Sequence, residues 1–214
     1  MPIRVQIVDS QPVVRRGLIM FLMTDSDIVV VGESAGGQDA PNMAQQLQPD
    51  VVLMDLLLPE ISSAAIIRTI REQQPSIHII ALSSSTDYPL ITSAILAGVD
   101  TYLHKGDHPT QVLTTIKDVV AGRVILPLAL RQRVLNELPP PVVISEPLTP
   151  SELAILKRLA ATQSDEEIAQ SLQLTREAVQ SALHHIQTQL SAPTRLLTVL
   201  RATQLGLIEP EAAS

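Results

Sequence analysis

The sequence contains no cysteine and very few aromatic residues. Cys and Trp are absent, and only two Tyr and one Phe occur among the 214 residues. The absence of cysteine excludes thiol catalysis, cysteine-ligated metal sites and disulfide bonds, and it agrees with a reducing compartment. Because 45% of the residues are hydrophobic but only 1% are aromatic, the core has to be aliphatic. An isolated aromatic residue can therefore serve a purpose other than core packing.

Long apolar runs are also absent. No run approaches the roughly 20 apolar residues that a membrane-spanning helix requires. The chain begins Met1-Pro2-Ile3-Arg4-Val5, with no apolar signal-peptide core behind a basic stretch. We therefore expect a cytoplasmic protein without a membrane partner.

Positive charge is scarce in the C-terminal third of the chain. The formal net charge is −7, from 15 Lys and Arg against 22 Asp and Glu. Residues 1–122 contain 7 basic and 13 acidic side chains, residues 123–147 contain 3 and 2, and residues 148–214 contain 5 and 7. The last segment therefore carries −2, whereas a DNA-binding domain is expected to present a positive surface.

Short β-branched runs alternate with amphipathic stretches over the first 122 residues. The expected strands cover residues 3–8, 28–32, 51–54, 78–82 and 101–103. The expected helices cover residues 12–23, 38–47, 62–73, 88–97 and 109–121. Nearly continuous apolar strands are typical of parallel sheets that are buried on both faces. Five such β–α units in succession predict a doubly wound α/β domain with right-handed crossovers.

The remaining sequence predicts helices only. A helix over residues 128–138 precedes Pro139-Pro140-Pro141, whose extended geometry makes a stiff spacer. Thr149-Pro150-Ser151-Glu152 and Ser164-Asp165-Glu166-Glu167 have the pattern of capping boxes, and Thr175 and Thr194 are further candidate caps. The second and third of these four helices are separated by about two residues, as in helix-turn-helix units. We expect a domain over residues 1–122, a linker over 123–147 and an all-α domain over 148–214.

Four polar residues lie at or just past the ends of predicted strands. Asp9, Asp55, Ser83 and Lys105 follow the first, third, fourth and fifth strands. Because the carboxyl ends of parallel strands meet at one edge of a sheet, these side chains should share one crevice. Two carboxylates, a hydroxyl and an ammonium suit phosphoryl transfer to a carboxylate beside Mg²⁺.

The segments that carry these residues resemble the receiver domains of NarL/FixJ-type response regulators. The similar segments are residues 7–9, 13–18, 51–59 and 98–105. The resemblance implies a flavodoxin-like (βα)5 receiver in which Asp55 is the phosphoacceptor and Lys105 its lysine partner. It also implies that the Ser83 hydroxyl follows the phosphoryl group and that Tyr102 is the aromatic that changes rotamer with it.

The same resemblance implies a Mg²⁺ site, held by Asp9, Asp55 and the backbone of Leu57, and phosphorylation by a sensor histidine kinase or a small phosphodonor. Ser10 departs from the pattern, because the family has a second acid at this position. A hydroxyl is a weaker ligand than a carboxylate for a hard cation, so Mg²⁺ binding should be weakened or lost. Two interpretations remain open. Either phosphorylation persists with lower efficiency, or the receiver keeps its fold and acts through contacts or oligomerisation.

The C-terminal segments resemble the LuxR-type DNA-binding domain of the same family. The similar segments are residues 148–152, 167–172 and 178–183. The expected buried stripe of the third helix is Val179, Leu183, Ile186 and Leu190. The expected DNA-binding residues are Arg176, Gln180, Ser181, His184 and His185.

Several lysines that are common in this family are missing here. Gln180 and Gln189 stand at two such positions and Glu166 at a third. The lost charges reduce phosphate neutralisation, although glutamine can still recognise adenine in the major groove. Leu196, Leu197 and Leu200 either pair two such domains in a homodimer or belong to the ordinary core.

We therefore expect a non-enzymatic, DNA-binding transcriptional response regulator that is controlled by phosphorylation of Asp55. The alternative is a regulator that works through protein contacts, with neither phosphorylation nor DNA binding essential. A catalyst acting on small molecules is the least favoured class, because no substrate-site chemistry beyond phosphoryl acceptance is visible.

Overall fold

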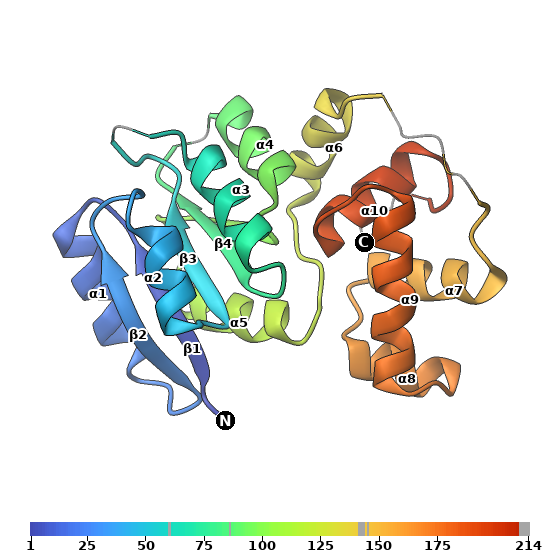
Figure 1. Cartoon of the computed structure of the whole chain (residues 1–214), viewed down its shortest axis with the longest axis horizontal. Helices are drawn as coiled ribbons and strands as arrows, with labels where there is room; N and C mark the ends of the chain where they lie inside the picture. Colours follow the sequence, from blue (N-terminus) through green and yellow to red (C-terminus); the bar gives the residue numbers. More distant parts are fainter. Residues whose placement is uncertain (60, 86, 141–143, 145, 210–214) are drawn as a thin grey trace. The chain divides into compact units, whose positions relative to one another are not determined.

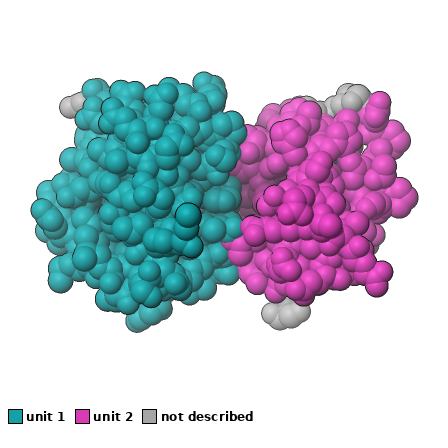
Figure 2. All heavy atoms as spheres, turned by 60° about the horizontal axis from the view of Figure 1, so that its bottom comes forward, with its two compact units in different colours: residues 1–120 teal, residues 121–214 magenta. Residues whose placement is uncertain are grey.

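The computed structural model describes residues 1–59, 61–85, 87–140, 144 and 146–209. It divides the chain into two compact units, Met1–Val120 and Ala121–Ser214 (Figure 2). Each unit has its own secondary-structure class, with every strand in the first. No helix among the described residues is long and apolar enough to span a membrane.

A five-stranded parallel sheet forms the centre of the first unit (Figure 1). Its strands are β1 (Ile3–Val8), β2 (Ile28–Ser34), β3 (Val51–Asp55), β4 (His78–Ser83) and β5 (Thr101–His104). They pair in the order β2-β1-β3-β4-β5. This order changes direction at β1, so the carboxyl ends of β1 and β3 border the crevice where doubly wound sheets carry their sites.

Helices cover both faces of this sheet. They are α1 (Pro12–Leu22), α2 (Ala40–Leu47), α3 (Ser63–Gln73), α4 (Tyr88–Ala97) and α5 (Pro109–Val120). Leu22 of α1 and Ile116 of α5 belong to one core cluster with Val5, Leu53 and Ile80 of the sheet. Helices α2, α3 and α4 contact one another in sequence order. The predicted doubly wound α/β architecture is therefore confirmed.

The first expected strand matches β1 at both ends, and the other four begin at the right residues but are slightly too short. β2 continues to Ser34, two residues beyond the predicted end, because its pairing with β1 extends to Val8 opposite Ser34. β3 and β4 end on Asp55 and Ser83, so these polar residues are the last residues of their strands. Each extension results from pairing with a neighbouring strand. The local sequence alone gives no information about this pairing.

The second unit contains only helices among its described residues. They are α6 (Leu128–Glu137), α7 (Pro150–Ala160), α8 (Asp165–Leu172), α9 (Arg176–Gln189) and α10 (Arg195–Gln204). Both predicted capping boxes are present, with Thr149 at the start of α7 and Ser164 at the start of α8. Thr175 and Thr194 cap α9 and α10 through their hydroxyl oxygens, as predicted.

The segment that we expected to be a linker lies in the second compact unit. The division falls after Val120, and α6 packs against α10. Beyond α6, the Gln204 amide donates to the carbonyl of Pro139 (3.1 Å), which ties the first proline to the end of α10. The remainder of the predicted spacer, from Pro141 to residue 143 and residue 145, lies outside the described residues, as do residues 210–214.

Candidate functional site

Three charged side chains meet at the carboxyl edge of the sheet. The Nζ atom of Lys105 lies 2.6 Å from Asp9 Oδ2 and 2.9 Å from Asp55 Oδ2. Both carboxylates are fully buried, at 0% exposure. Burying two anions is costly unless cations compensate them, and Lys105 contacts both carboxylates but offsets only one of the two negative charges. The structure thus brings together residues separated by 96 positions in the sequence, from 9 to 105.

Backbone amides hold the other oxygen of each carboxylate. Gln11 N donates to Asp9 Oδ1 (2.8 Å), and Leu57 N donates to Asp55 Oδ1 (3.0 Å). Each bond spans two residues, as the chain turns away from the end of its strand. The Oδ1 atoms are therefore occupied locally, while both Oδ2 atoms are directed toward Lys105.

Ser83 and Tyr102 lie beside this pocket on the neighbouring strands. Ser83 is fully buried, its carbonyl accepts from Lys105 N (2.9 Å) and its hydroxyl accepts from Ser85 N (3.0 Å). The Tyr102 hydroxyl donates to the carbonyl of the same Ser85 (3.2 Å). Burial, and then the charge of Asp107, raise the pKa of Tyr102 above its usual value. Tyr102 thus contacts the loop that begins at Ser83.

The oxygen donors at this edge meet only part of what a Mg²⁺ ion needs. Asp9 and Asp55 supply hard carboxylate oxygens, and a backbone carbonyl such as that of Leu57 is also a suitable donor. Ser10, which is partly exposed, adds only a neutral hydroxyl. No group of three or more His, Cys, Asp or Glu that could hold a metal occurs in the described part of the chain. The donors therefore suit Mg²⁺ in type, but their total charge is low.

Sequence reasoning did not assign a role to Arg15. Its Nη1 atom donates to the carbonyl of Asp9 (2.7 Å), and its Nε atom donates to Glu33 Oε2 (3.0 Å). Arg15 thereby joins the end of β1 to α1 and β2 and fixes the backbone that carries Asp9. The segment containing Arg15 was part of the resemblance, but nothing in the local pattern indicated this contact.

The comparisons with known proteins agree with this pocket. The family model described as the response regulator receiver domain matches residues 5–117. The response regulator protein VraR of Staphylococcus saprophyticus is 30% identical over 209 residues, which are 98% of this chain and 100% of that protein. The chain belongs to the NarL/FixJ-type response regulators. The sequence-based identification is therefore confirmed.

Solved structures extend the likeness to this response regulator's fold. A LuxR-family two-component response regulator from Aurantimonas sp. SI85-9A1 is 26% identical with a TM-score of 0.58, covering 64% of this chain and 98% of that chain. The response regulator ChrA of a heme-sensing two-component system is 26% identical with a TM-score of 0.52, covering 97% and 99%. The second match spans the receiver and the helical unit together.

The helical unit of the response regulator contains a tight helix-turn-helix. Helix α8 ends at Gln173, which adopts a left-handed conformation (φ 57°), and Leu174 N donates back to the carbonyl of Ala169 (2.9 Å). Thr175 then caps α9. The predicted apolar stripe of α9 is buried throughout, comprising Val179, Leu183, Ile186 and Leu190.

All five expected DNA-binding residues of α9 are exposed, namely Arg176, Gln180, Ser181, His184 and His185. The Gln180 amide is also anchored, because its Nε2 atom donates to Asp165 Oδ2 (3.2 Å) at the start of α8. These residues form a polar surface above the buried stripe.

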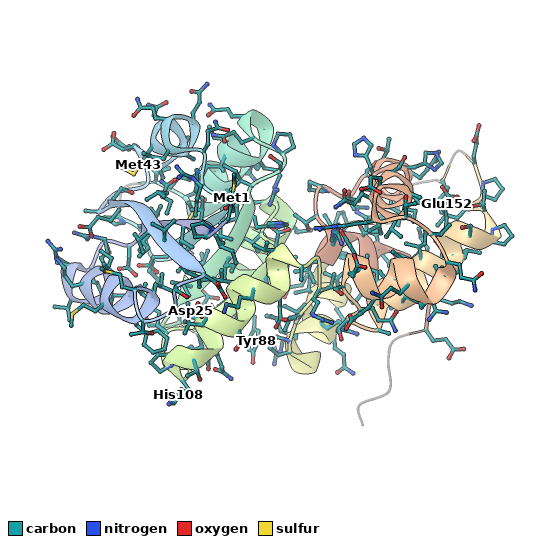
Figure 3. All side chains as sticks on the ribbon, turned by 90° about the horizontal axis from the view of Figure 1, so that it is seen from below. Met1, Asp25, Met43, Tyr88, His108 and Glu152 are labelled. Carbon is teal, nitrogen blue, oxygen red and sulfur yellow. The ribbon has the colours of Figure 1, made fainter. Side chains whose placement is uncertain are left out.

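His185 is exposed like the other expected contacts, but its ring also pairs with an acidic residue of another helix. Its Nδ1 atom lies 2.5 Å from Glu152 Oε1 at the start of α7, a residue labelled in Figure 3. Burial raises the pKa of Glu152, but the Thr149 amide and His185 outweigh this effect and lower it below its usual range. His185 thus joins two helices of the unit, α7 and α9, and its role as a DNA contact stays a prediction.

The leucines of α10 belong to the core of the response regulator. Leu196, Leu197 and Leu200 are 1%, 2% and 0% exposed, and α10 contacts α6, α7 and α9. Of the two alternatives that the sequence left open, the structure favours core packing.

Proposed function

We propose that the chain is a transcriptional response regulator in which phosphorylation of Asp55 controls DNA binding by the helix-turn-helix. The convergence of Asp9, Asp55 and Lys105 carries this proposal, with Lys105 Nζ 2.6 Å and 2.9 Å from the two carboxylates. A sensor histidine kinase or a small acyl phosphate would serve as donor, a homodimer would be the DNA-bound form, and the chain would have no catalytic activity toward small molecules.

The pocket supports phosphoryl transfer to the Oδ2 atom of Asp55. Since Leu57 N holds Oδ1, Oδ2 is the atom available to attack the phosphorus of the donor. The bond from phosphorus to the donor breaks as the bond to Oδ2 forms, and the donor leaves with the electron pair. Lys105 pairs with the incoming oxygens, and the buried Ser83 hydroxyl can donate a hydrogen bond to them.

A Mg²⁺ ion would supply additional positive charge beside the phosphoryl oxygens. Asp9, Asp55 and the Leu57 carbonyl would hold it. With Ser10 in place of an acid, the affinity for Mg²⁺ should be low, and Lys105 should carry a larger share of the charge neutralisation. We infer that phosphorylation is slow in this chain.

The exposed side of α9 supports recognition of DNA in the major groove. Gln180 has the hydrogen-bonding groups to recognise adenine, and Arg176 can neutralise a phosphate. The low positive charge of residues 148–214, with 5 basic against 7 acidic residues, implies weak binding outside specific sites. Dimerisation would compensate by doubling the contacts.

Two observations favour the alternative regulator that works through protein contacts. Ser10 removes an acid from the pocket, and the first turn of α8 carries an exposed acid, Glu166. Acidic side chains stabilise a helix N-terminus but repel phosphate groups. This alternative retains the fold of both units and requires neither phosphate nor DNA.

Incubation with acetyl phosphate and Mg²⁺ tests the receiver, with phosphoprotein resolved on a phosphate-affinity gel. We expect slow modification of the wild type, none of Asp55→Asn, and faster modification of Ser10→Asp at lower Mg²⁺. An unmodified wild type beside a modified Ser10→Asp would instead establish the phosphorylation-independent alternative. Equal modification of wild type and Asp55→Asn would show that Asp55 is not the acceptor.

Selection of genomic DNA fragments by the full chain at low salt tests the second unit. We expect a shared sequence to be enriched, and we expect Gln180→Lys to tighten non-specific binding and steepen its logarithmic salt dependence by about one. A folded sample that enriches no sequence would contradict DNA recognition. Unchanged affinity of Gln180→Lys would show that this side of α9 does not meet DNA.

A further inference from the structure

A three-residue connector, residues 121–123, is fastened to the helix-turn-helix at three points. The carbonyl of Ala121 accepts from Asp165 N (3.1 Å), at the first residue of α8. The carbonyl of Gly122 accepts from Arg195 Nη1 (3.1 Å), at the first residue of α10. Arg123 forms two bonds with Glu167, from Nη1 (2.6 Å) and Nη2 (3.0 Å). The connector follows Val120, the last residue of α5, with no residue between them.

The Asp165 carboxylate links this connector to the recognition helix. Arg195 donates to both of its oxygens, from Nη1 to Oδ1 and from Nη2 to Oδ2 (2.9 Å). Gln180 Nε2 donates to the same Oδ2 atom (3.2 Å). Asp165 is only 3% exposed. A buried carboxylate thus joins α8, α9 and α10, and the arginine that pairs with it also binds the connector.

The connector packs so closely that its central residue has to be glycine. Gly122 has φ +86°, a conformation that favours glycine. A Cβ atom there would overlap with Arg195 Nη1 and would lie 2.7 Å from Asp165 Oδ1. A methyl group at this position would therefore clash with the Arg195–Asp165 ion pair.

The two carboxylates of this network, on Asp165 and Glu167, have pKa values below their usual range. Burial raises the pKa of Asp165, but Arg195 and then Gln180 outweigh burial and leave it below its usual value. The two bonds from Arg123 contribute most to lowering the pKa of Glu167 to about 2. Both carboxylates are accordingly ionised near neutral pH.

We propose that Asp165 is a positioning residue that orients the Gln180 amide for base recognition, and that the connector sets its position through Arg195. This inference rests on the proposed DNA-binding function and assigns the recognition residue a support within the helical unit, which runs from the connector through Arg195 and Asp165 to Gln180.

The bond to Asp165 gives the Gln180 amide a defined orientation. One N–H of Nε2 is used by the carboxylate, which leaves the second N–H and the carbonyl oxygen available for a base. An oxygen acceptor beside an N–H donor matches the N6 and N7 edge of adenine. A glutamine that rotates freely would lose part of this preference.

Side-chain amide NMR signals of Gln180 in the full-length protein test the inference without DNA. Gln180→Ala assigns the signals by their disappearance. We expect Gly122→Ala and Arg195→Lys to shift them. The matched control is Gly206→Ala, which adds the same methyl group at another left-handed glycine (φ +69°) with nothing within 4 Å. Signals that stay unshifted in folded Gly122→Ala and Arg195→Lys would overturn the inference, as would an equal shift in Gly206→Ala.

A double-mutant cycle on a fragment selected by the wild type tests the consequence for DNA. We expect Gly122→Ala to bind about tenfold more weakly, in line with the loss of an oriented pair of base contacts. In a Gln180→Ala background the same change should alter the affinity by less than about twofold. A tenfold loss in both backgrounds would overturn the inference. If the wild type selects no fragment, the proposed function fails, while the NMR experiment still decides this inference.

Discussion

At the residue scale, one buried ion pair of the receiver is held by several bonds. Its cation is Arg71, a residue that the sequence did not indicate. Its guanidinium donates to the carbonyls of Pro75, Ile77 and Gly98 at 2.7–2.8 Å and to Asp100 Oδ2 at 2.8 Å. It ties the end of α3 to the loop between α4 and β5. Removing one partner of such a pair leaves a buried charge without compensation, which is strongly destabilising.

Asp100→Asn should change how the free energy of unfolding of the receiver depends on pH. Burial alone raises the pKa of Asp100, but Arg71 and then His78 outweigh it and lower the pKa from 3.8 to about 2. Because the folded state binds the proton more weakly than the unfolded state, the stabilisation is complete above pH 4 and is lost as the pH falls toward 2. We expect ionised Asp100 to stabilise the folded state by about 2 kcal/mol. Urea unfolding between pH 7 and pH 2 measures this stabilisation.

The wild type, measured beside Asp100→Asn at each pH, provides the control for this prediction. Asp100→Asn should be less stable than the wild type at pH 7, and the difference should shrink as the pH approaches 2. A difference that stays constant over this range would show that ionised Asp100 does not stabilise the fold.

At the scale of single helices, the starts of α7 and α8 are determined by local sequence. Thr149 Oγ1 accepts from Glu152 N (3.3 Å), and Glu152 Oε2 accepts from Thr149 N (2.8 Å). Ser164 and Glu167 form the same reciprocal pair. Because both partners lie within three residues, the motif was predicted without tertiary information.

Thr149→Ala should lower the free energy of unfolding of the helical unit by about 1 kcal/mol, since the first turn of α7 loses its side-chain acceptor. Thr188→Ala is a matched control. The Thr188 hydroxyl donates to the carbonyl of His184 inside α9 and caps nothing, so this change should be neutral or slightly stabilising. Thermal unfolding followed by circular dichroism measures both variants, and an equal loss in the two would contradict the capping role.

At the scale of the whole molecule, the aromatic residues are confined to one of the two units. Phe21, Tyr88 and Tyr102 all lie within Met1–Val120. Tyrosine fluorescence therefore reports on the receiver alone, whereas far-ultraviolet circular dichroism reports on the helices of both units. Each unit also has its own apolar core, with Ile80 in one and Ile186 in the other.

The two optical signals should follow different urea transitions, because separate cores unfold independently unless a large interface couples them. Asp100→Asn should shift the tyrosine transition to lower urea. Thr149→Ala should leave the tyrosine transition in place and shift only the dichroism signal. Coincident transitions that both variants shift together would indicate that the chain unfolds as one cooperative body.

The sequence alone was sufficient to predict that Asp9, Asp55 and Lys105 meet in one pocket. Each of its residues ends a short apolar strand, and a parallel sheet brings all such ends to one edge whatever the details of packing. Caps and the buried stripe of α9 were predictable for a similar reason, because their partners lie three or four residues apart. The ends of β2, β3 and β4 were less certain, since pairing with a neighbouring strand extends each of them.

Tertiary structure decided how the helix-turn-helix is held. It turned His185 toward Glu152 and placed Leu196 in the core. It also brought Arg195 to the Asp165 carboxylate and to the carbonyl of Gly122. These partners lie up to 73 residues apart, from Gly122 to Arg195. No periodicity or short motif relates them, because the side chains meet only after the helices have packed and buried a charge that then needs a partner.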